Sequence, residues 1–223
     1  GSSSVGIGAA IAINVPILKN EAYIGANADI HAGGLVVEAL MTNVDEDTKQ
    51  EFGAEATSGA SGKSVGIAGS LALGILDAES SAVIKSGADV TITGGGNVRL
   101  TAENTTVNTV IAKPANAGAA AGSVGVGASV ALNIANTSTV AALADTAVLT
   151  GAKDLTLSAT SDNSVITTAK AGGAATGGSG VGIGGAIAIS VVSNDTHTTL
   201  GSGGLQTVTG NLNATSTHVG STT

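Results

Sequence analysis

The stretch SVGIGAAIAIN, residues 4–14, decides the fold, because close variants of it return three times along the chain. The variants are SVGIAGSLALG from residue 64, SVGVGASVALN from residue 123 and GVGIGGAIAIS from residue 180. Their first valines, Val5, Val65, Val124 and Val181, follow one another at intervals of 60, 59 and 57 residues. A period of this length is typical of a repeat array. The sequence therefore predicts tandem units at about residues 4–63, 64–122, 123–179 and 180–223.

The repeated stretch alternates bulky and small apolar residues. In its first copy the bulky side chains stand at odd positions, and Gly6, Gly8, Ala10 and Ala12 lie between them. Such alternation predicts a β-strand, and since neither face is polar we expect cover on both sides, as in buried parallel sheets. The bulky residues predicted to be buried in strands are Val5, Ile7, Ile11, Ile13, Val65, Ile67, Leu71, Leu73, Val124, Val126, Val130, Leu132, Val181, Ile183, Ile187 and Ile189.

Three further segments follow the repeated stretch in each unit. The second segment aligns Ile24, Ile84, Leu143 and Leu200 in one column and bends at a polar corner in its middle. The third alternates apolar and polar residues, as in LTLSA at residues 155–159, which predicts a strand with one buried face and one wet face. The fourth segment occupies residues 50–57, 108–117 and 164–175 and ends in turns rich in glycine and alanine.

The pattern as a whole predicts the fold class. No segment carries the three-four spacing or the capping residues of a helix. Strands with short corners and a fixed period predict an all-β chain, a parallel β-solenoid (β-helix) built from about four tandem units of 57–60 residues. We expect residues 1–223 to form a single segment of a longer array. One wide rung per unit is favoured, while shorter rungs and an antiparallel sandwich remain alternatives.

Composition narrows the class further. The chain has 34 glycines, no cysteine and a net charge of −8, and Tyr23 and Phe52 are its only aromatic residues. A core without large rings must consist of thin layers of small side chains, which suits stacked sheets. The net negative charge and the small number of Lys and Arg residues, eight in all, exclude a basic stripe of the kind that binds nucleic acids. No apolar run is long enough to span a bilayer.

Lys63 raises the question of a phosphate-binding loop. The stretch SGKS at residues 61–64 resembles the end of such a loop, but Thr57 stands where the motif requires glycine, and the sequence that follows alternates like a strand. The equivalent positions in the next two units are Gly122 and Ser179. We therefore interpret Lys63 as a turn residue.

The sequence contains no recognisable catalytic, cofactor or metal site. His31, His197 and His218 occupy different positions in their units and lack ligand spacing. The acidic loop at residues 45–51 could bind calcium, although a solvated charged loop is the ordinary case. Asp29 aligns with Asp89 beside a corner, and no group of carboxylates suits a polysaccharide-active enzyme. Threonine-rich stretches suggest ice-binding solenoids, but they do not recur in one column.

The stretches SVGIGAAIAIN and EAYIGANADIHAGGLVVEA, with SVGVGASVALN and TGAKDLTLSATS later on, resemble a known class of repeat. They resemble the repeat regions of filamentous-haemagglutinin-like large exoproteins and leukotoxin-type filamentous adhesins. The resemblance covers essentially the whole chain and depends on composition more than on a specific motif. It implies a β-solenoid shaft that is secreted to, or displayed on, the outer surface of a Gram-negative cell.

Two functions follow from this resemblance. In the first, the chain is a structural shaft segment that spaces or mediates cell attachment. In the second, an exposed β face binds a glycan or a host protein directly. Binding sites favour exposed aromatic residues and arginine, and with Arg99 as the single arginine the sequence favours the shaft. The expected partners are neighbouring repeats of the same polypeptide, with end-to-end self-association through the open ends.

Overall fold

The computed structural model describes residues 4–223, with side chains described for all of these except residues 116–118. Residues 1–3, which belong to the predicted segment, lie outside the described residues. The chain is all-β, and the described residues contain no helix. All pairings between its named strands are parallel, and the strands form three sheets.

We name the sheets A, B and C. Sheet A contains β1 (Val5–Asn14), β2 (Ile17–Ile24), β6 (Val65–Ile84), β9 (Val124–Leu143) and β13 (Val181–Leu200). Sheet B contains the short strands β3 (Asp29–Ala32), β7 (Asp89–Ile92), β10 (Val148–Ala152) and β14 (Gln206–Val208). Sheet C contains β4 (Leu35–Ala39), β5 (Gln50–Gly62), β8 (Val98–Ala121), β11 (Leu155–Ala169), β12 (Gly173–Ala175) and β15 (Leu212–Thr222).

Equivalent residues of successive repeats lie side by side in the sheets. In sheet A, Val5 is opposite Val65, Val65 is opposite Val124, and Val124 is opposite Val181. The predicted column of Ile24, Ile84, Leu143 and Leu200 is present in the same sheet. The columns inferred from the sequence are therefore confirmed, and the arrangement is consistent with the predicted β-solenoid.

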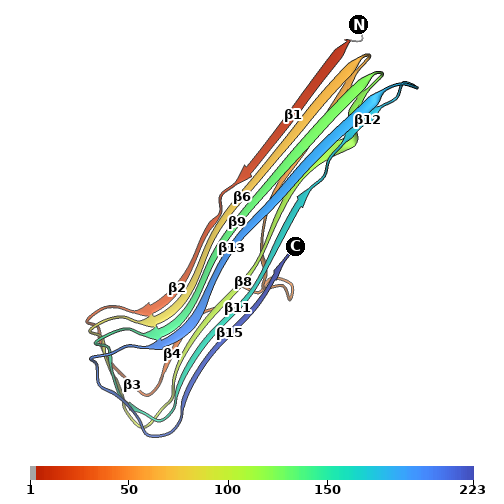
Figure 1. The fold of residues 1–223 in the computed structure, drawn as a ribbon. Coiled ribbons are helices and arrows are strands. Elements are labelled where there is room, and N and C mark those ends of the chain that lie inside the picture. Colours follow the sequence, from red (N-terminus) through yellow and green to blue (C-terminus); the bar gives the residue numbers. More distant parts are fainter. Residues whose placement is uncertain (1–3) are drawn as a thin grey trace.

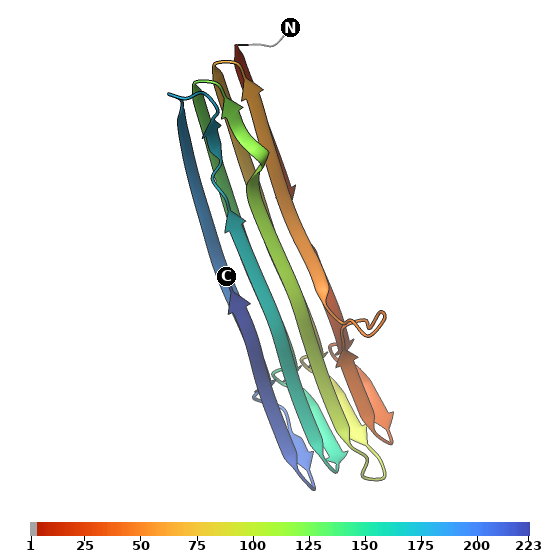
Figure 2. The same cartoon turned by 90° about the vertical axis from the view of Figure 1, so that its right-hand side faces the viewer.

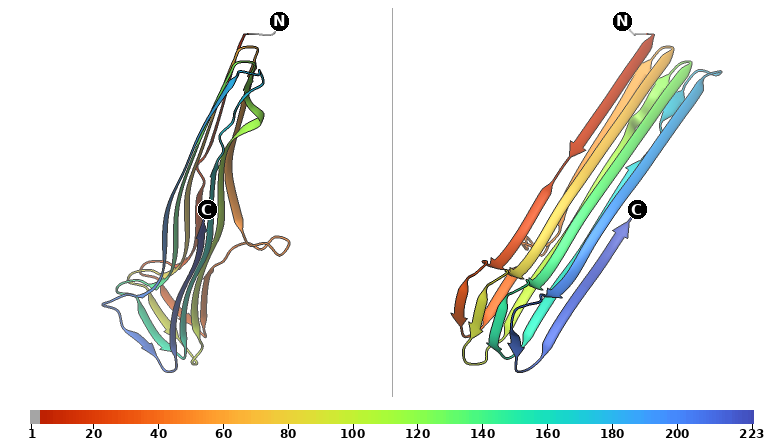
Figure 3. Two further views of the ribbon diagram at one scale, coloured as in Figure 1. Left: turned by 45° about the vertical axis from the view of Figure 1, so that its right-hand side comes forward. Right: turned by 60° about the vertical axis from the view of Figure 1, so that its left-hand side comes forward.

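The molecule is a long, flat wedge (Figure 1). Sheets A and C run alongside each other over most of its length, and sheet B joins them at one end (Figure 2). Viewed from the side, the two long sheets converge towards the end where β1 begins and separate towards sheet B (Figure 3). The interior is therefore wide beside sheet B and narrow at the opposite end.

Large apolar side chains fill the wide end. The main core cluster brings together residues of all three sheets, among them Ile84, Val90 and Leu100 with Leu143 and Leu149, all fully buried. Equivalent residues, such as Ile84 and Leu143 or Val90 and Leu149, are neighbours in adjacent strands, so they stack at the strand spacing of about 4.8 Å. The wide end is thus a core of ordinary side chains that continues from one unit to the next.

The third segment has the predicted half-buried pattern in β4 and β11, whereas β15, at the edge of sheet C, is exposed on both faces. In β11, Leu155, Leu157 and Ala159 are buried, whereas Thr156 and Ser158 on the other face are only partly covered. The alternation places the apolar residues against the wide core and the hydroxyls on the outer surface of sheet C.

Only small residues fit at the narrow end. The inward face of β6 there consists of Gly66, Ala68, Ser70 and Ala72, all of which are buried. Across the gap, β5 and β8 contribute alanines to the same cluster, and its one larger residue, Val110, packs against Gly74 of β6 where the gap begins to widen. A Cβ atom on Gly66 would come within 2.8 Å of the carbonyl oxygen of Ala120. Glycine and alanine are therefore required where the backbones of sheets A and C approach each other.

This close approach overturns one sequence prediction. The sixteen bulky residues of the repeated stretch lie in strands, as predicted, but their predicted burial is wrong because they face outward from sheet A. The exposed ones are Val5, Ile7, Ile11, Ile13, Ile67, Leu71, Val181, Ile183, Ile187 and Ile189. The half-buried ones are Val65, Leu73, Val124, Val126, Val130 and Leu132. Sheet C covers the small face of β1, β6 and β9 instead, while both faces of β13 are exposed along this stretch, and sheet A has no cover on its bulky face among the described residues.

The corner between sheets A and B has the same backbone conformation in every repeat. Asn27, Gly87, Thr146 and Gly203 occupy equivalent positions and have φ values of 57°, 73°, 63° and 78°. This left-handed region favours glycine and asparagine and disfavours a β-branched residue. Thr146 is therefore held in its conformation by the surrounding corner, which indicates that the corner geometry is set by the stacking of units.

A substitution at the narrow end tests this packing. We expect Gly127→Ala to lower the free energy of unfolding by about 2–3 kcal/mol, because the new Cβ would overlap the carbonyl oxygen of Gly172. The matched control is Gly69→Ala, whose Cβ would meet no atom within 4 Å, so stability should be unchanged or slightly higher. Chemical denaturation of both variants measures the difference, and equal stabilities would contradict the described sheet spacing.

Candidate functional site

The outer surface of sheet A carries a continuous apolar area. We call it the apolar face; it consists of alternate residues in the stretches Val5 to Val15, Val65 to Ile75, Val124 to Ile134 and Val181 to Val191. Ile67 and Leu71, on an inner strand of the sheet, are still 42% and 40% exposed. Proteins rarely leave so large a contiguous apolar area in water unless it has a partner.

The apolar face has a regular relief. Its third row across the strands consists of the small residues Ala9, Gly69, Ala128 and Gly185, while all its other rows are bulky. A shallow groove follows this small row and is lined on one side by the row that contains Leu71. The face therefore presents a groove that crosses the strands, with ridges of valine, leucine and isoleucine beside it.

The apolar face ends where charged residues begin. Further along the same surface, Lys19 forms ion pairs with Glu79 at 3.4 Å and with Glu21 at 3.8 Å. Attraction by Glu79, followed by its hydrogen bond and the charge of Glu21, raises the pKa of Lys19. All three side chains are well exposed. Sheet A therefore has an uncharged half and a charged half on its outer surface.

Ion pairs on sheet C connect the first unit to the second. Arg99 on β8 pairs with Glu38 on β4, and Lys113 on β8 pairs with Glu55 on β5 at 2.6 Å. The hydrogen bond and the charge of Lys113 lower the pKa of the Glu55 carboxyl. These ion pairs link neighbouring strands at the surface of sheet C, so we assign them a structural role.

A layer of buried polar residues joins sheets A and C at mid-length. Asn108 donates to the side-chain oxygen of Asn133 at 2.7 Å, and Asn133 donates to the backbone oxygens of Asn108 and Ile166. A second set connects Thr106 to Asn163 at 2.7 Å and Asn163 to Thr137 at 3.0 Å. These groups satisfy one another, so the layer has a structural role.

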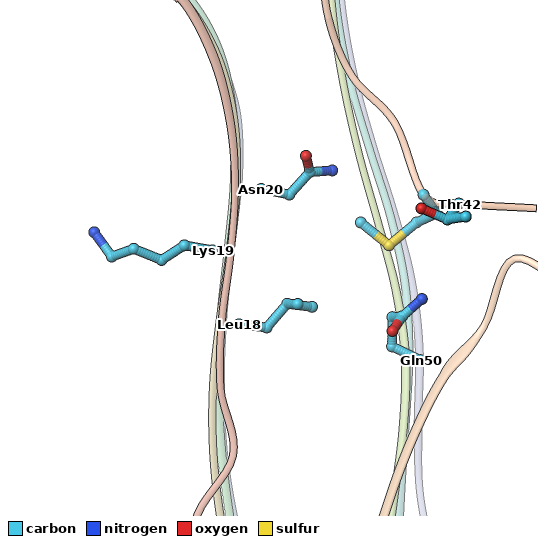
Figure 4. Close-up of a pocket in the computed structure, with 6 residues that line it drawn as sticks. Leu18, Lys19, Asn20, Thr42 and Gln50 are labelled. Atoms are coloured by element: carbon cyan, nitrogen blue, oxygen red, sulfur yellow. The ribbon is translucent and has the colours of Figure 1, made fainter.

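A small pocket lies at the edge formed by the first unit. It is lined by Leu18, Lys19, Asn20, Met41, Thr42 and Gln50. Leu18 and Asn20 point into it from β2, whereas Lys19 points away (Figure 4). Asn20 donates to the backbone oxygen of Leu40 at 2.8 Å, so the amide is already occupied. The pocket has no group of charged or nucleophilic side chains that would indicate chemistry.

The acidic loop forms a tight turn. Asp45 and Glu46 both have positive φ, and Val44 and Asp47 exchange backbone hydrogen bonds across them. The Asp47 carboxylate accepts the backbone N–H of Lys49 at 2.8 Å. Throughout the part of the chain that the structure describes, no group of three or more His, Asp or Glu side chains could hold a metal ion. Whether this loop binds calcium stays an open sequence hypothesis.

The structure does not bring the three histidines together. His31 lies on sheet B and contacts Asp29 at 3.2 Å, and His197 lies on sheet A and contacts Asp195 at 3.0 Å. His218 lies on sheet C, where its Nδ1 is 2.6 Å from the hydroxyl of Ser161. Each histidine therefore has its own local partner.

Among the described residues, the aligned carboxylates form one neighbouring pair and no larger cluster. Asp29 and Asp89 are opposite each other in sheet B, as the alignment predicted, and Glu38 lies opposite Thr101 in sheet C.

Within residues 4–223 no helix has the length and apolar character needed to cross a membrane. The exposed apolar face is the feature that sequence reasoning missed, since the alternation was visible but the choice of inner face was not.

Lys63 occupies the predicted turn. It lies in a bend between β5 and β6, is exposed, and is followed by a strand. Gly122 approaches the backbone of Lys63 at the equivalent turn of the next unit. The strand–loop–helix geometry of a phosphate-binding loop does not occur here.

Comparison with protein-family models, with curated proteins and with solved structures finds no match.

The turn interpretation of Lys63 has a direct test. We expect Lys63→Ala to change the free energy of unfolding by no more than about 0.5 kcal/mol, as for other exposed positions. ATP with magnesium should not raise the melting temperature of either protein in a thermal-shift measurement. A rise in the parent that Lys63→Ala abolishes would restore the phosphate-loop hypothesis.

Proposed function

We propose that the chain is a parallel β-solenoid of about four tandem units and serves as a structural shaft segment of a large secreted bacterial surface filament or adhesin. One observation carries the proposal: residues about 60 positions apart are hydrogen-bonded neighbours in parallel strands of all three sheets. Each unit then adds one layer along a common axis, which is how solenoid arrays lengthen. A rod of this kind keeps its ends apart, as a shaft must.

The outermost strands support the same function. Sheet A ends in β1 and β13, and sheet B ends in β3 and β14. Unpaired backbone groups on such edges are templates for further parallel strands. Continuous stacking with neighbouring repeats would cover them and would lengthen the rod without a change in its cross-section.

The resemblance to filamentous-haemagglutinin-like exoproteins and leukotoxin-type filamentous adhesins suggests where the shaft acts. On this proposal the chain lies on the outer surface of a Gram-negative cell and spaces an adhesive region from it. The lack of cysteine and the net charge of −8 are compatible with a secreted surface protein.

Single-molecule stretching between the termini tests the shaft. We expect successive unfolding events that each release roughly 200 Å of chain, since a unit of about 60 residues extends by about 3.4 Å per residue. Stacked units contact only their neighbours and should therefore detach one at a time from an end. A single event that releases the whole chain would contradict a stack of tandem units.

Direct ligand binding by an outer β face is the alternative function. The polar outer surface of sheet C offers neighbouring hydroxyls, such as Ser158 and Thr215, which suit a glycan. A glycan array probed with the whole chain distinguishes the two functions, and the shaft predicts no signal above that of an unrelated protein. A specific signal that is lost on Ser158→Ala, but not on Ser164→Ala in the same strand, would favour glycan binding.

A further inference from the structure

The apolar face has a size that suits a protein interface. It extends over about eleven residues along the strands and across the four strands β1, β6, β9 and β13. At a rise of about 3.3 Å per residue and a strand spacing of about 4.8 Å, this gives roughly 650 Å² per copy. Two such faces would bury roughly 1,300 Å², which lies within the range of stable protein interfaces.

The relief of the face is complementary to itself. Along β6 the outward residues run Val65, Ile67, Gly69, Leu71, Leu73 and Ile75. If a second copy lies on the first with its strands reversed, the row of Gly69 faces the row of Leu71. The row of Ile67 then faces that of Leu73, and the row of Val65 faces that of Ile75. Each groove then receives a ridge, and all six rows are covered. With the strands in the same direction the small row would face itself and leave a void.

The charges at the borders of the face are complementary in the same arrangement. Asp77 follows the last apolar row on β6, and Lys63 precedes the first. Reversal of the strands places Asp77 of one copy near Lys63 of the other, twice in each pair. The face itself carries no ionisable group, so two chains of net charge −8 can meet there without bringing like charges into contact.

We propose that two copies of this chain associate face to face through the apolar face, with their strands antiparallel across the interface. The two-fold axis runs along the direction in which the strands stack, so each strand faces the same strand of the other copy. This is an isologous interface, in which one surface is its own partner. The pairing does not depend on the proposed shaft function, and its tests are separate from those of the shaft.

Chemical cross-linking tests the orientation, and the chain has no native cysteine to interfere. Facing sheets lie about 10 Å apart, a distance that a short bismaleimide can span. We expect a cross-linked dimer from an equimolar mixture of Ile67→Cys and Leu73→Cys. Each variant alone should give little product, because its two cysteines would lie roughly 20 Å apart along the strands. Self-linking of each variant without mixed linking would overturn the antiparallel arrangement.

A charge exchange tests the border contacts without altering the apolar rows. Lys63→Glu and Asp77→Lys should each weaken dimerisation roughly fivefold in analytical ultracentrifugation, since each variant places like charges together twice. The double variant Lys63→Glu/Asp77→Lys should restore the affinity of the parent. If the double variant is as weak as the single ones, or if none differs from the parent, the proposed register is wrong.

A third experiment identifies the surface that is used. Ile67→Lys should convert the dimer to monomer while the circular dichroism spectrum is unchanged, because Ile67 lies on the outer surface. The control is Val36→Lys on β4, an exposed valine of sheet C, which should leave the dimer intact. A parent chain that is monomeric at about 100 μM would overturn the proposal. Association that Ile67→Lys does not reduce would also overturn the proposal, because it would indicate end-to-end contact. Binding of a monomeric chain to neutral lipid vesicles would overturn it as well.

Discussion

The close approach of sheets A and C at the narrow end is the constraint on which the rest of the structure depends. Where the backbones come this close, the inner positions must be glycine, alanine or serine, as at Gly66, Ala68 and Ser70. The strand alternation then sends every bulky residue of the repeated stretch outward. One spacing therefore determines both the small-residue interior at the narrow end and the exposed apolar face, and large buried side chains such as Leu76 and Ile84 occur only where the sheets separate towards sheet B.

The sequence predicted the lateral order of the strands but not the direction in which they face. The repeat placed Val5, Val65, Val124 and Val181 in one column, and the structure confirms this, because equivalent residues of parallel strands pair in register. The LTLSA pattern at residues 155–159 also fixed its buried side, since only one of its faces is apolar. In the repeated stretch both faces are apolar, so the side that faces inward depends on the distance between sheets A and C, which periodicity does not encode.

The buried amide layer explains how a core with so few large side chains can specify one alignment of its sheets. Small apolar residues pack in many nearly equivalent ways, whereas the cross-sheet pairs Asn108–Asn133 and Asn163–Thr137 are satisfied in a single arrangement. A shift of one sheet along the other would leave these buried groups without partners, at about 1–3 kcal/mol each. The buried amides therefore specify the alignment of the two sheets, whereas the apolar contacts contribute to the stability of the fold.

The loop at residues 40–49 shows where such a chain can gain new sequence. Ala39 and Gln50 pair with Ala102 and Thr106, so ten residues in the first unit replace three in the second. The extra residues protrude from the side of the molecule, and the strands on both sides keep their register (Figure 3). Lengthening a surface loop costs little, because the closure entropy grows slowly with length. Such a site can accept inserted residues without a change in the paired strands, which makes it a practical place for grafting a peptide.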